Sequence, residues 1–372
     1  MKFNNFVVAV VAAIAGLGAQ TANAQWSITD LGDLPGGSNL SQAFGINNTG
    51  QVVGYSSAAT GNRVFLWQNG IMTNLGDVPG EEVSPRRAHS INNSGQVVGY
   101  GFTASGTRAF VWQNGSMTNL GDLPGGADSS TAYGINNSGQ VVGGSGAATG
   151  VRAFLWQNGS MTDLGDLPGG GDFSVASSIN DSGQVVGYSG AGANTSRRAF
   201  LWQNGIMTNL GDLPGGYDNS EAYGINNAGQ VVGNSRNARG DHAFLWQNGS
   251  MTDLGDLAGG ADFGWSYASG INNSGQVVGN SWNGTGGRAF MWQNGVMADL
   301  NTFAGVAGMG WTLERATAIN DVGQIVGYGT NPQGVEHAFL LTPVPEPETY
   351  AMLLAGLGLI GAAFKRRARK QG

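Results

Sequence analysis

Aromatic and charged side chains that could bind a ligand gather in two short segments that recur along the chain and differ at each occurrence. Aromatic rings beside carboxylates and guanidinium groups suit stacking on sugar rings with hydrogen bonds to hydroxyl groups, and they equally suit contact with a protein partner. The alternative is that these rings only pack the segments that carry them. The candidates are Glu81, Arg86, Phe173, Tyr217, Phe263, Trp265, Trp282 and Trp311, with Glu82, Arg87 and Glu221 in the same segments.

Three carboxylates, Glu81, Glu221 and Glu314, are the candidates for acid–base chemistry if the protein is an enzyme, which would then be a glycan hydrolase or lyase. Retaining hydrolysis needs two carboxyl groups about 5 to 5.5 Å apart, and no spacing along this chain establishes such a pair. The absence of cysteine excludes a thiolate nucleophile, a thiolate metal site and a disulfide framework. We therefore expect a non-enzymatic protein and assign no catalytic residue.

A basic residue recurs at one position of a repeated phrase, at Arg63, Arg108, Arg152, Arg198, His242, Arg288 and His337. An aspartate follows 14 residues later in the first five occurrences, at Asp77, Asp122, Asp166, Asp212 and Asp256. The two residues can form an ion pair, or the aspartate can cap the next turn; both roles are structural. Because the three histidines are dispersed and no dense aspartate loop suits calcium, we expect neither a metal nor a cofactor.

Two phrases that alternate along the chain must position all these residues. Ala-Phe-Leu-Trp-Gln-Asn-Gly and Gly-Gln-Val-Val-Gly occur in seven copies, with small variations. The glycine that opens the second phrase stands at Gly50, Gly95, Gly139, Gly183, Gly229, Gly275 and Gly323, so successive spacings are 45, 44, 44, 46, 46 and 48 residues. A period in the forties with strand-like composition indicates propeller blades rather than helical repeats.

Each unit reads as four short strands separated by turns. The pair Asn158-Gly159 is typical of a two-residue hairpin, because a type I′ turn needs positive φ at both central residues. Two segments vary from unit to unit: the one after Pro-Gly-Gly and the one between the second and third strands. In four-stranded blades joined in this way, both variable segments lie on one rim of the ring, and the tight Asn-Ser-Gly and Asn-Gly turns lie on the other. The candidate binding residues are therefore expected to share one rim.

The seventh unit stops before its fourth strand, and the missing strand stands at the other end of the chain. Residues 27–34 match residues 160–167 nearly position for position, whereas the seventh unit ends at Thr342-Pro343. We predict that residues 27–34 pair with Phe339-Leu340-Leu341 and close an all-β, seven-bladed propeller over residues 25–343. Closure removes sheet edges that would otherwise favour aggregation.

Both ends of the chain carry export signals. Lys2, an apolar run and Ala22-Asn23-Ala24 predict a signal peptide over residues 1–24, cleaved between Ala24 and Gln25. Residues 344–348 precede an apolar stretch at 349–364, a predicted transmembrane helix, and a basic tail at 365–372 that should stay cytoplasmic. Between Gln25 and Pro343, 11 arginines and 22 acidic residues give a net charge of −11, which disfavours nucleic acid as a partner.

The order Pro345-Glu346-Pro347, apolar helix and arginine-rich end resembles the PEP-CTERM sorting signal; an ordinary C-terminal anchor is the alternative. The resemblance implies a Gram-negative envelope protein, held in the membrane by its C-terminal helix until an exosortase processes it for the cell surface or exterior. Arg-Ala-Phe-Leu-Trp and its histidine variants resemble the extracellular HAF repeat, which implies export and a structural or binding role. We expect an exported propeller that binds extracellular polysaccharide or an envelope protein, or else a passive surface layer.

Overall fold

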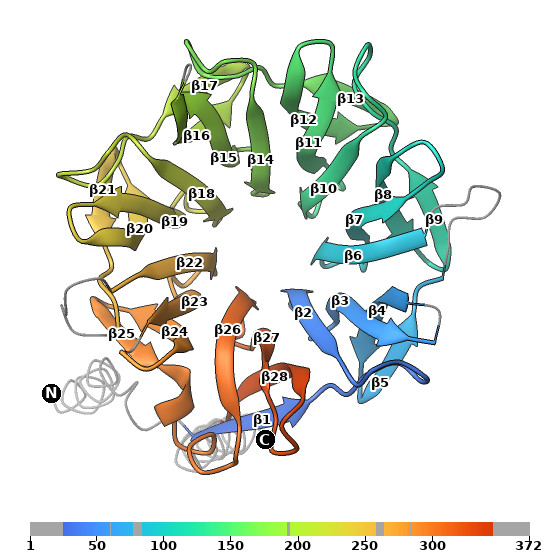
Figure 1. The fold of residues 1–372 in the computed structure, drawn as a ribbon, viewed down its shortest axis with the longest axis vertical. Coiled ribbons are helices and arrows are strands. Elements are labelled where there is room, and N and C mark those ends of the chain that lie inside the picture. The colour runs from blue at the N-terminus through green and yellow to red at the C-terminus, as the bar shows by residue number, and fades with distance from the viewer. Residues whose placement is uncertain are drawn as a thin grey trace, which may run out of the picture.

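Seven four-stranded sheets stand in a ring around a central channel (Figure 1), which confirms the predicted seven-bladed propeller. The computed structural model describes residues 25–59, 61–76, 84–191, 194–257, 264–282 and 284–344. The predicted signal peptide, the Pro345-Glu346-Pro347 motif and the predicted helix at 349–364 lie outside these ranges. Within them, no helix is long and apolar enough to cross a membrane.

The strands occupy four positions from the channel outwards (Figure 1). The innermost strands are β2 (Ser41–Ile46), β6 (Ser84–Ile91), β10 (Ser130–Ile135), β14 (Ser174–Ile179), β18 (Ser220–Ile225), β22 (Ser266–Ile271) and β26 (Thr312–Ile319). The second strands are β3 (Val52–Ala58), β7 (Val97–Phe102), β11 (Val141–Ala147), β15 (Val185–Ala191), β19 (Val231–Asn237), β23 (Val277–Trp282) and β27 (Ile325–Thr330). The third strands are β4 (Gly61–Gln68), β8 (Thr107–Gln113), β12 (Gly150–Gln157), β16 (Asn194–Gln203), β20 (Gly240–Gln247), β24 (Gly287–Gln293) and β28 (Glu336–Val344). The outermost strands are β5 (Ile71–Asn74), β9 (Ser116–Asn119), β13 (Ser160–Asp163), β17 (Ile206–Asn209), β21 (Ser250–Asp253), β25 (Val296–Asp299) and β1 (Gln25–Asp30). Blade 1 is β2–β5, the next blades follow in chain order, and blade 7 is β26–β28 with β1; a short helical turn, η1 (Leu300–Thr302), follows β25.

The last blade contains both ends of the described chain. Strand β1 pairs antiparallel with β28, with Ile28 opposite Leu341 and Asp30 opposite Phe339. The predicted pairing of the N-terminal strand is therefore confirmed. Trp26 on β1 is 6% exposed and belongs to a core cluster that includes Phe339, so the N-terminal strand contributes packing as well as hydrogen bonds.

Most of the hydrophobic core lies between neighbouring blades rather than inside any one of them. The phenylalanine of each Phe-Leu-Trp phrase, or of its variants, is fully buried, for example Phe154. It packs across the blade interface against Val98 and Ala109 of blade 2. The closing glycine of Gly-Gln-Val-Val-Gly makes room for this ring, because a Cβ on Gly143 would lie 2.8 Å from Phe154 and 1.9 Å from the Thr131 carbonyl oxygen.

Two closed rings of hydrogen bonds surround one end of the channel. In the inner ring, each side-chain amide donates to the backbone carbonyl of its counterpart in the next blade at 3.0–3.1 Å. The inner ring consists of Asn47, Asn92, Asn136, Asn180, Asn226, Asn272 and Asn320. In the outer ring, each backbone N–H donates to the next side-chain oxygen at 2.8–3.0 Å. The outer ring consists of Asn48, Asn93, Asn137, Asp181, Asn227, Asn273 and Asp321. The repeated Ile-Asn-Asn phrase therefore serves contacts between blades.

Candidate functional site

The central channel is narrow at one end and wide at the other. At the end formed by the two asparagine rings, a cavity of about 160 Å³ is lined by the Ile-Asn-Asn phrases and their variants. At the opposite end, near the start of the innermost strands, the channel widens into a cavity of about 630 Å³, here called the wide mouth. The innermost strands begin after the variable Pro-Gly-Gly segments, so the wide mouth opens on the rim where sequence variation predicts binding.

The fourteen residues that line the wide mouth come from three positions in the blades. The first position, on the innermost strand, supplies Gln42, Arg87, Val175 and Arg315. The second, two residues later, supplies one residue in every blade: Phe44, His89, Tyr133, Ser177, Tyr223, Ser269 and Thr317. The third, on the second strand, supplies Tyr55, Tyr188 and Tyr328. Six aromatic rings and two guanidinium groups therefore surround one cavity.

A backbone irregularity repeated in every blade accounts for the second position. The pairing of the first two strands shifts register there, as between Ala132 and Gly134 around Tyr133. Such a β-bulge leaves one residue unpaired and changes the direction of its side chain. Residues at the first and third positions are directly opposite each other across the strands, as Gln42 is opposite Tyr55, and therefore share a face.

Arg87 stacks on aromatic rings of the neighbouring blade. Its guanidinium carbon lies 4.6 Å from the centre of the Phe44 ring and 5.3 Å from that of Tyr55. Phe44 in turn lies 6.3 Å from Tyr328 of blade 7, measured between ring centres. No carboxylate of the described residues forms an ion pair with Arg87 or Arg315.

A second arginine stack lies at the edge of the wide mouth and is neutralised. The Arg197 guanidinium lies 4.6 Å from the ring of Tyr188 and 5.9 Å from that of Phe173. Its Nη1 is 2.8 Å from Oε1 of Glu221, and the other carboxylate oxygen of Glu221 accepts a 2.5 Å hydrogen bond from the Tyr223 hydroxyl. The two stacks therefore resemble each other in their rings and differ in their charge balance.

Burial favours the neutral forms of four side chains at the wide mouth, His89, Tyr133, Tyr188 and Tyr223. Burial lowers the pKa of His89 to about 3, and the charge of Arg87 acts in the same direction. Burial raises the pKa of Tyr188 to about 12 and also raises the pKa values of Tyr133 and Tyr223. At neutral pH, the wide mouth therefore presents a neutral imidazole and protonated phenol groups beside two permanent cations.

Several buried polar atoms around the wide mouth have no partner among the described residues. They are Nε2 of His89 and Oγ of Ser269, both on lining residues, and Oδ1 of Asn234 and Asn280, which occupy the third position in blades 5 and 6. Asn234 is only 6% exposed. Unpaired buried polar atoms are uncommon in folded proteins, and those of the lining residues His89 and Ser269 are candidates for hydrogen bonds to a polar ligand.

The six described rim candidates lie outside the set of lining residues and do not form one group. Trp265 contacts Trp282, with ring centres 6.3 Å apart, and Phe173 packs on Tyr188 at 6.0 Å. Trp311 is half-buried and packs against Phe339 and the blade 7 core. The Arg86 guanidinium lies 5.4 Å from the ring centre of Phe102, and Tyr217 is 68% exposed. Glu81 and Phe263 fall outside the described residues.

Sequence reasoning missed most of the wide mouth because it examined only the variable loops. The lining residues stand inside the repeated strand phrases, where single positions vary between fixed neighbours. Ala-Tyr-Gly-Ile-Asn at Tyr133 becomes Ala-His-Ser-Ile-Asn at His89 and Ala-Ser-Gly-Ile-Asn at Ser269. Aligning the seven copies column by column would have shown this variation.

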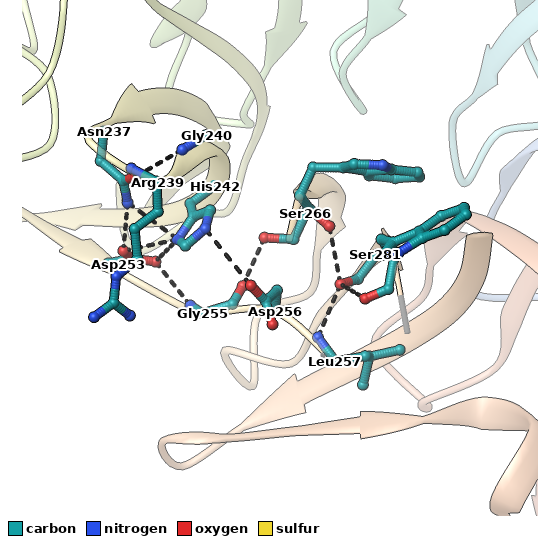
Figure 2. A network of polar contacts seen from close by, with 12 residues as sticks. Asn237, Arg239, Gly240, His242, Asp253, Gly255, Asp256, Leu257, Ser266 and Ser281 are labelled. Atoms are coloured by element: carbon teal, nitrogen blue, oxygen red, sulfur yellow. Dashed lines mark hydrogen bonds and ion pairs between the residues drawn. The ribbon is translucent and has the colours of Figure 1, made fainter. Parts of the chain in front are cut away.

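The repeated basic position is structural, with partners that differ from blade to blade. Arg152 is 2.5 Å from Asp166, the predicted aspartate, and also pairs with Asp172. Figure 2 shows the corresponding residue of blade 5, His242, between two carboxylates, with Nδ1 2.9 Å from Oδ2 of Asp253 and Nε2 3.7 Å from Oδ2 of Asp256. The hydrogen bond to Asp253 raises the pKa of His242.

The carboxylates considered for catalysis lie in different blades and are engaged by neighbouring groups. Glu221 is on β18 and binds Arg197 and Tyr223, as described above. Glu314 is on β26, two blades away, and accepts a 2.8 Å hydrogen bond from the Thr330 hydroxyl. The structure does not bring these two residues together at the wide mouth.

A comparison with protein families matches residues 343–369 to the PEP-CTERM protein-sorting motif. This motif is a signal for export and for sorting by an exosortase, with the protein held at the membrane during sorting. The match covers the chain end only and says nothing of the repeats, whose likeness to the HAF repeat stays a prediction. No curated protein matches the chain.

A comparison with solved structures finds similar chains at low sequence identity. TolB from Acinetobacter baumannii is 10% identical over 77% of this chain and 76% of its own, with a TM-score of 0.43. Porphyromonas gingivalis dipeptidyl peptidase 4 is 10% identical over 77% of this chain and 48% of its own, with a TM-score of 0.41. An oligogalacturonate lyase in complex with manganese is 12% identical over 87% of this chain and 99% of its own, with a TM-score of 0.49.

Proposed function

We propose that this exported protein is a non-enzymatic saccharide-binding propeller whose ligand occupies the wide mouth of the central channel. The observation that carries the proposal is the aromatic lining of one open cavity. Its volume of about 630 Å³ falls inside the range of about 300–1,000 Å³ typical of ligand sites. Six aromatic rings supply flat apolar surfaces for the C–H faces of sugar rings.

The polar groups of the wide mouth complement sugar hydroxyl groups. The phenol groups of Tyr55, Tyr133, Tyr188 and Tyr328 and the hydroxyl groups of Ser177 and Ser269 can donate or accept hydrogen bonds. The hydroxyl groups of Tyr223 and Thr317 donate to protein oxygens, so they offer acceptor positions. The buried, unpartnered atoms of Ser269 and His89 provide further positions for such bonds. Processing by an exosortase near Pro345-Glu346-Pro347 would then present this binding site at the cell surface or outside the cell.

Two of the rim tryptophans could bind the further sugar units of a longer saccharide. Trp265 lies 5.5 Å from Tyr267 and 6.3 Å from Trp282, measured between ring centres, so three rings form one group on the variable rim. We propose that this group contacts sugar units that project beyond the wide mouth. Trp282→Ala should then weaken binding of a polysaccharide while leaving binding of a disaccharide unchanged.

Glycan-array screening and calorimetry with the detergent-solubilised full-length protein test the proposal. Tyr133→Ala and Tyr328→Ala should each weaken saccharide binding about tenfold or more, because each removes a stacking surface. Tyr133→Phe keeps the ring and should retain most of the affinity. Tyr217→Ala, which removes an exposed ring outside the cavity, is the matched control. Saccharide binding that survives both alanine substitutions, or no binding to any glycan, would refute the assignment.

A further inference from the structure

Resting on the proposed function, we propose that the wide mouth selects saccharides that bear a carboxylate, and that Arg87 and Arg315 bind this carboxylate. Both arginines line the cavity, on the blades that flank blade 1 on either side. Phe44 of blade 1 connects the two sides, since its ring contacts the Arg87 guanidinium at 4.6 Å and the Tyr328 ring at 6.3 Å. Tyr328 is the cross-strand neighbour of Arg315.

The charge of the wide mouth is opposite to that of the whole protein. The chain carries a net charge of −7, and its repeat region is more acidic still. The lining residues nevertheless include two arginines and neither aspartate nor glutamate. The nearby Glu336 accepts a 2.7 Å hydrogen bond from Gln42. A cationic cavity inside an acidic protein favours an anionic ligand.

Comparison with the Arg197 stack shows that the Arg87 stack lacks a carboxylate partner among the described residues. Arg197 lies on aromatic rings and is neutralised by Glu221 at 2.8 Å. Arg87 lies on the rings of Phe44 and Tyr55 in a similar way, but no carboxylate among the described residues is within ion-pair distance of it. Guanidinium groups bind carboxylates in bidentate geometry. A ligand carboxylate would therefore take the place that Glu221 takes beside Arg197.

The remaining groups of the cavity agree with an anionic sugar. His89 is neutral at physiological pH because burial lowers its pKa, and burial also keeps the hydroxyl groups of Tyr133 and Tyr188 protonated. The aromatic rings can stack on the sugar while hydrogen-bond donors surround its acid group. A uronic-acid unit combines these two features, an apolar ring face and a carboxylate, in one residue.

Calorimetry of the full-length protein with a uronic-acid oligosaccharide and with its carboxyl-reduced, neutral counterpart tests the inference. We expect the acidic form to bind at least about tenfold more tightly, in line with one bidentate arginine–carboxylate contact. The difference should shrink between 50 and 300 mM salt, roughly as screening predicts. Arg315→Gln, at an exposed position, and Arg87→Gln should each remove most of it, and Arg87→Lys should restore only part. Arg239→Gln, which removes an exposed charge from the β19–β20 loop of the same rim, should leave it unchanged.

The outcomes separate this inference from the proposed function. Equal affinity for the acidic and neutral oligosaccharides would overturn the carboxylate selection while leaving saccharide binding intact. An oligosaccharide that bears sulfate esters instead of carboxylates is the third arm, and tighter binding of that form through the same arginines would reassign the anion to a sulfate ester. Failure of all three to bind would overturn the proposed function together with the inference.

Discussion

Replacing Asn136 with alanine tests whether the inner asparagine ring holds the blades together. The Oδ1 atom of Asn136 accepts from the backbone amides of Ser138 at 3.1 Å and Gln140 at 3.0 Å. Its Nδ2 donates to Oε1 of Gln140 at 2.7 Å and to the carbonyl of Asn180, in the next blade, at 3.1 Å. Each such bond contributes about 0.5–1.5 kcal/mol, and the side chain is only 3% exposed. We expect Asn136→Ala to lower the free energy of unfolding by about 3 kcal/mol.

Urea denaturation followed by tryptophan fluorescence measures this loss, and the neighbouring residue provides the control. Asn137 belongs to the exposed outer ring, so Asn137→Ala should change stability by no more than about 1 kcal/mol. Asn136→Asp keeps the Oδ1 acceptor but places a charged oxygen against the carbonyl of Asn180, so it should destabilise at least as much as alanine. If Asn136→Ala is as stable as Asn137→Ala, or if Asn136→Asp is as stable as the native protein, the inner asparagine ring does not stabilise the contacts between blades.

Because β1 closes the ring, we expect Trp26→Ala, which empties a buried site, to lower the free energy of unfolding by about 3–5 kcal/mol. Ser27→Ala, at an exposed position of the same strand, should change it by less than about 0.5 kcal/mol. Similar melting temperatures for the two variants would contradict the packing role of Trp26. The pKa of His242 is raised by its hydrogen bond to a carboxylate, so its contribution is complete below the unfolded value of 6.5 and is lost as pH rises through the folded pKa. His242→Gln should therefore lower the melting temperature more at pH 5.5 than at pH 9. Arg152→Gln, at the same position of blade 3, should lower it by the same amount at both pH values. A decrease in the histidine variant that does not depend on pH would refute this coupling. Because burial lowers the pKa of His89 to about 3, one histidine ring should show no NMR titration between pH 5 and 8, and titration of all three near 6.5 would show that this site is not buried.

Much of the fold follows from local sequence features. The seven copies, the Asn-Gly hairpins and the match between residues 27–34 and 160–167 together predicted blades, their number and the joint at which they close. These features succeed because turn geometry and strand alternation depend on residues close together in the chain. The predicted rim was also the rim on which the wide mouth opens.

The candidate site was predicted only in part, because the sequence does not show which strand face points into the channel. Alternation tells which residues share a face, but the bulge at Tyr133 and its counterparts shifts that alternation by one residue. Trp311, a residue predicted for the binding rim, is half-buried and packs against the core cluster that includes Phe339.

By itself, the sequence determined the repeated unit, the C-terminal sorting motif and the residue types available to each blade, because these depend on composition and on neighbours along the chain. Only the tertiary structure decided which of those residues meet. Arg87 and Arg197 are both arginines of the variable rim. Arg197 pairs with Glu221, whereas Arg87 lies on the rings of Phe44 and Tyr55 with no carboxylate of the described residues within ion-pair distance. That difference arises because the groups come from adjacent blades, roughly 20 to 45 residues apart in the chain, and ring closure sets their distances.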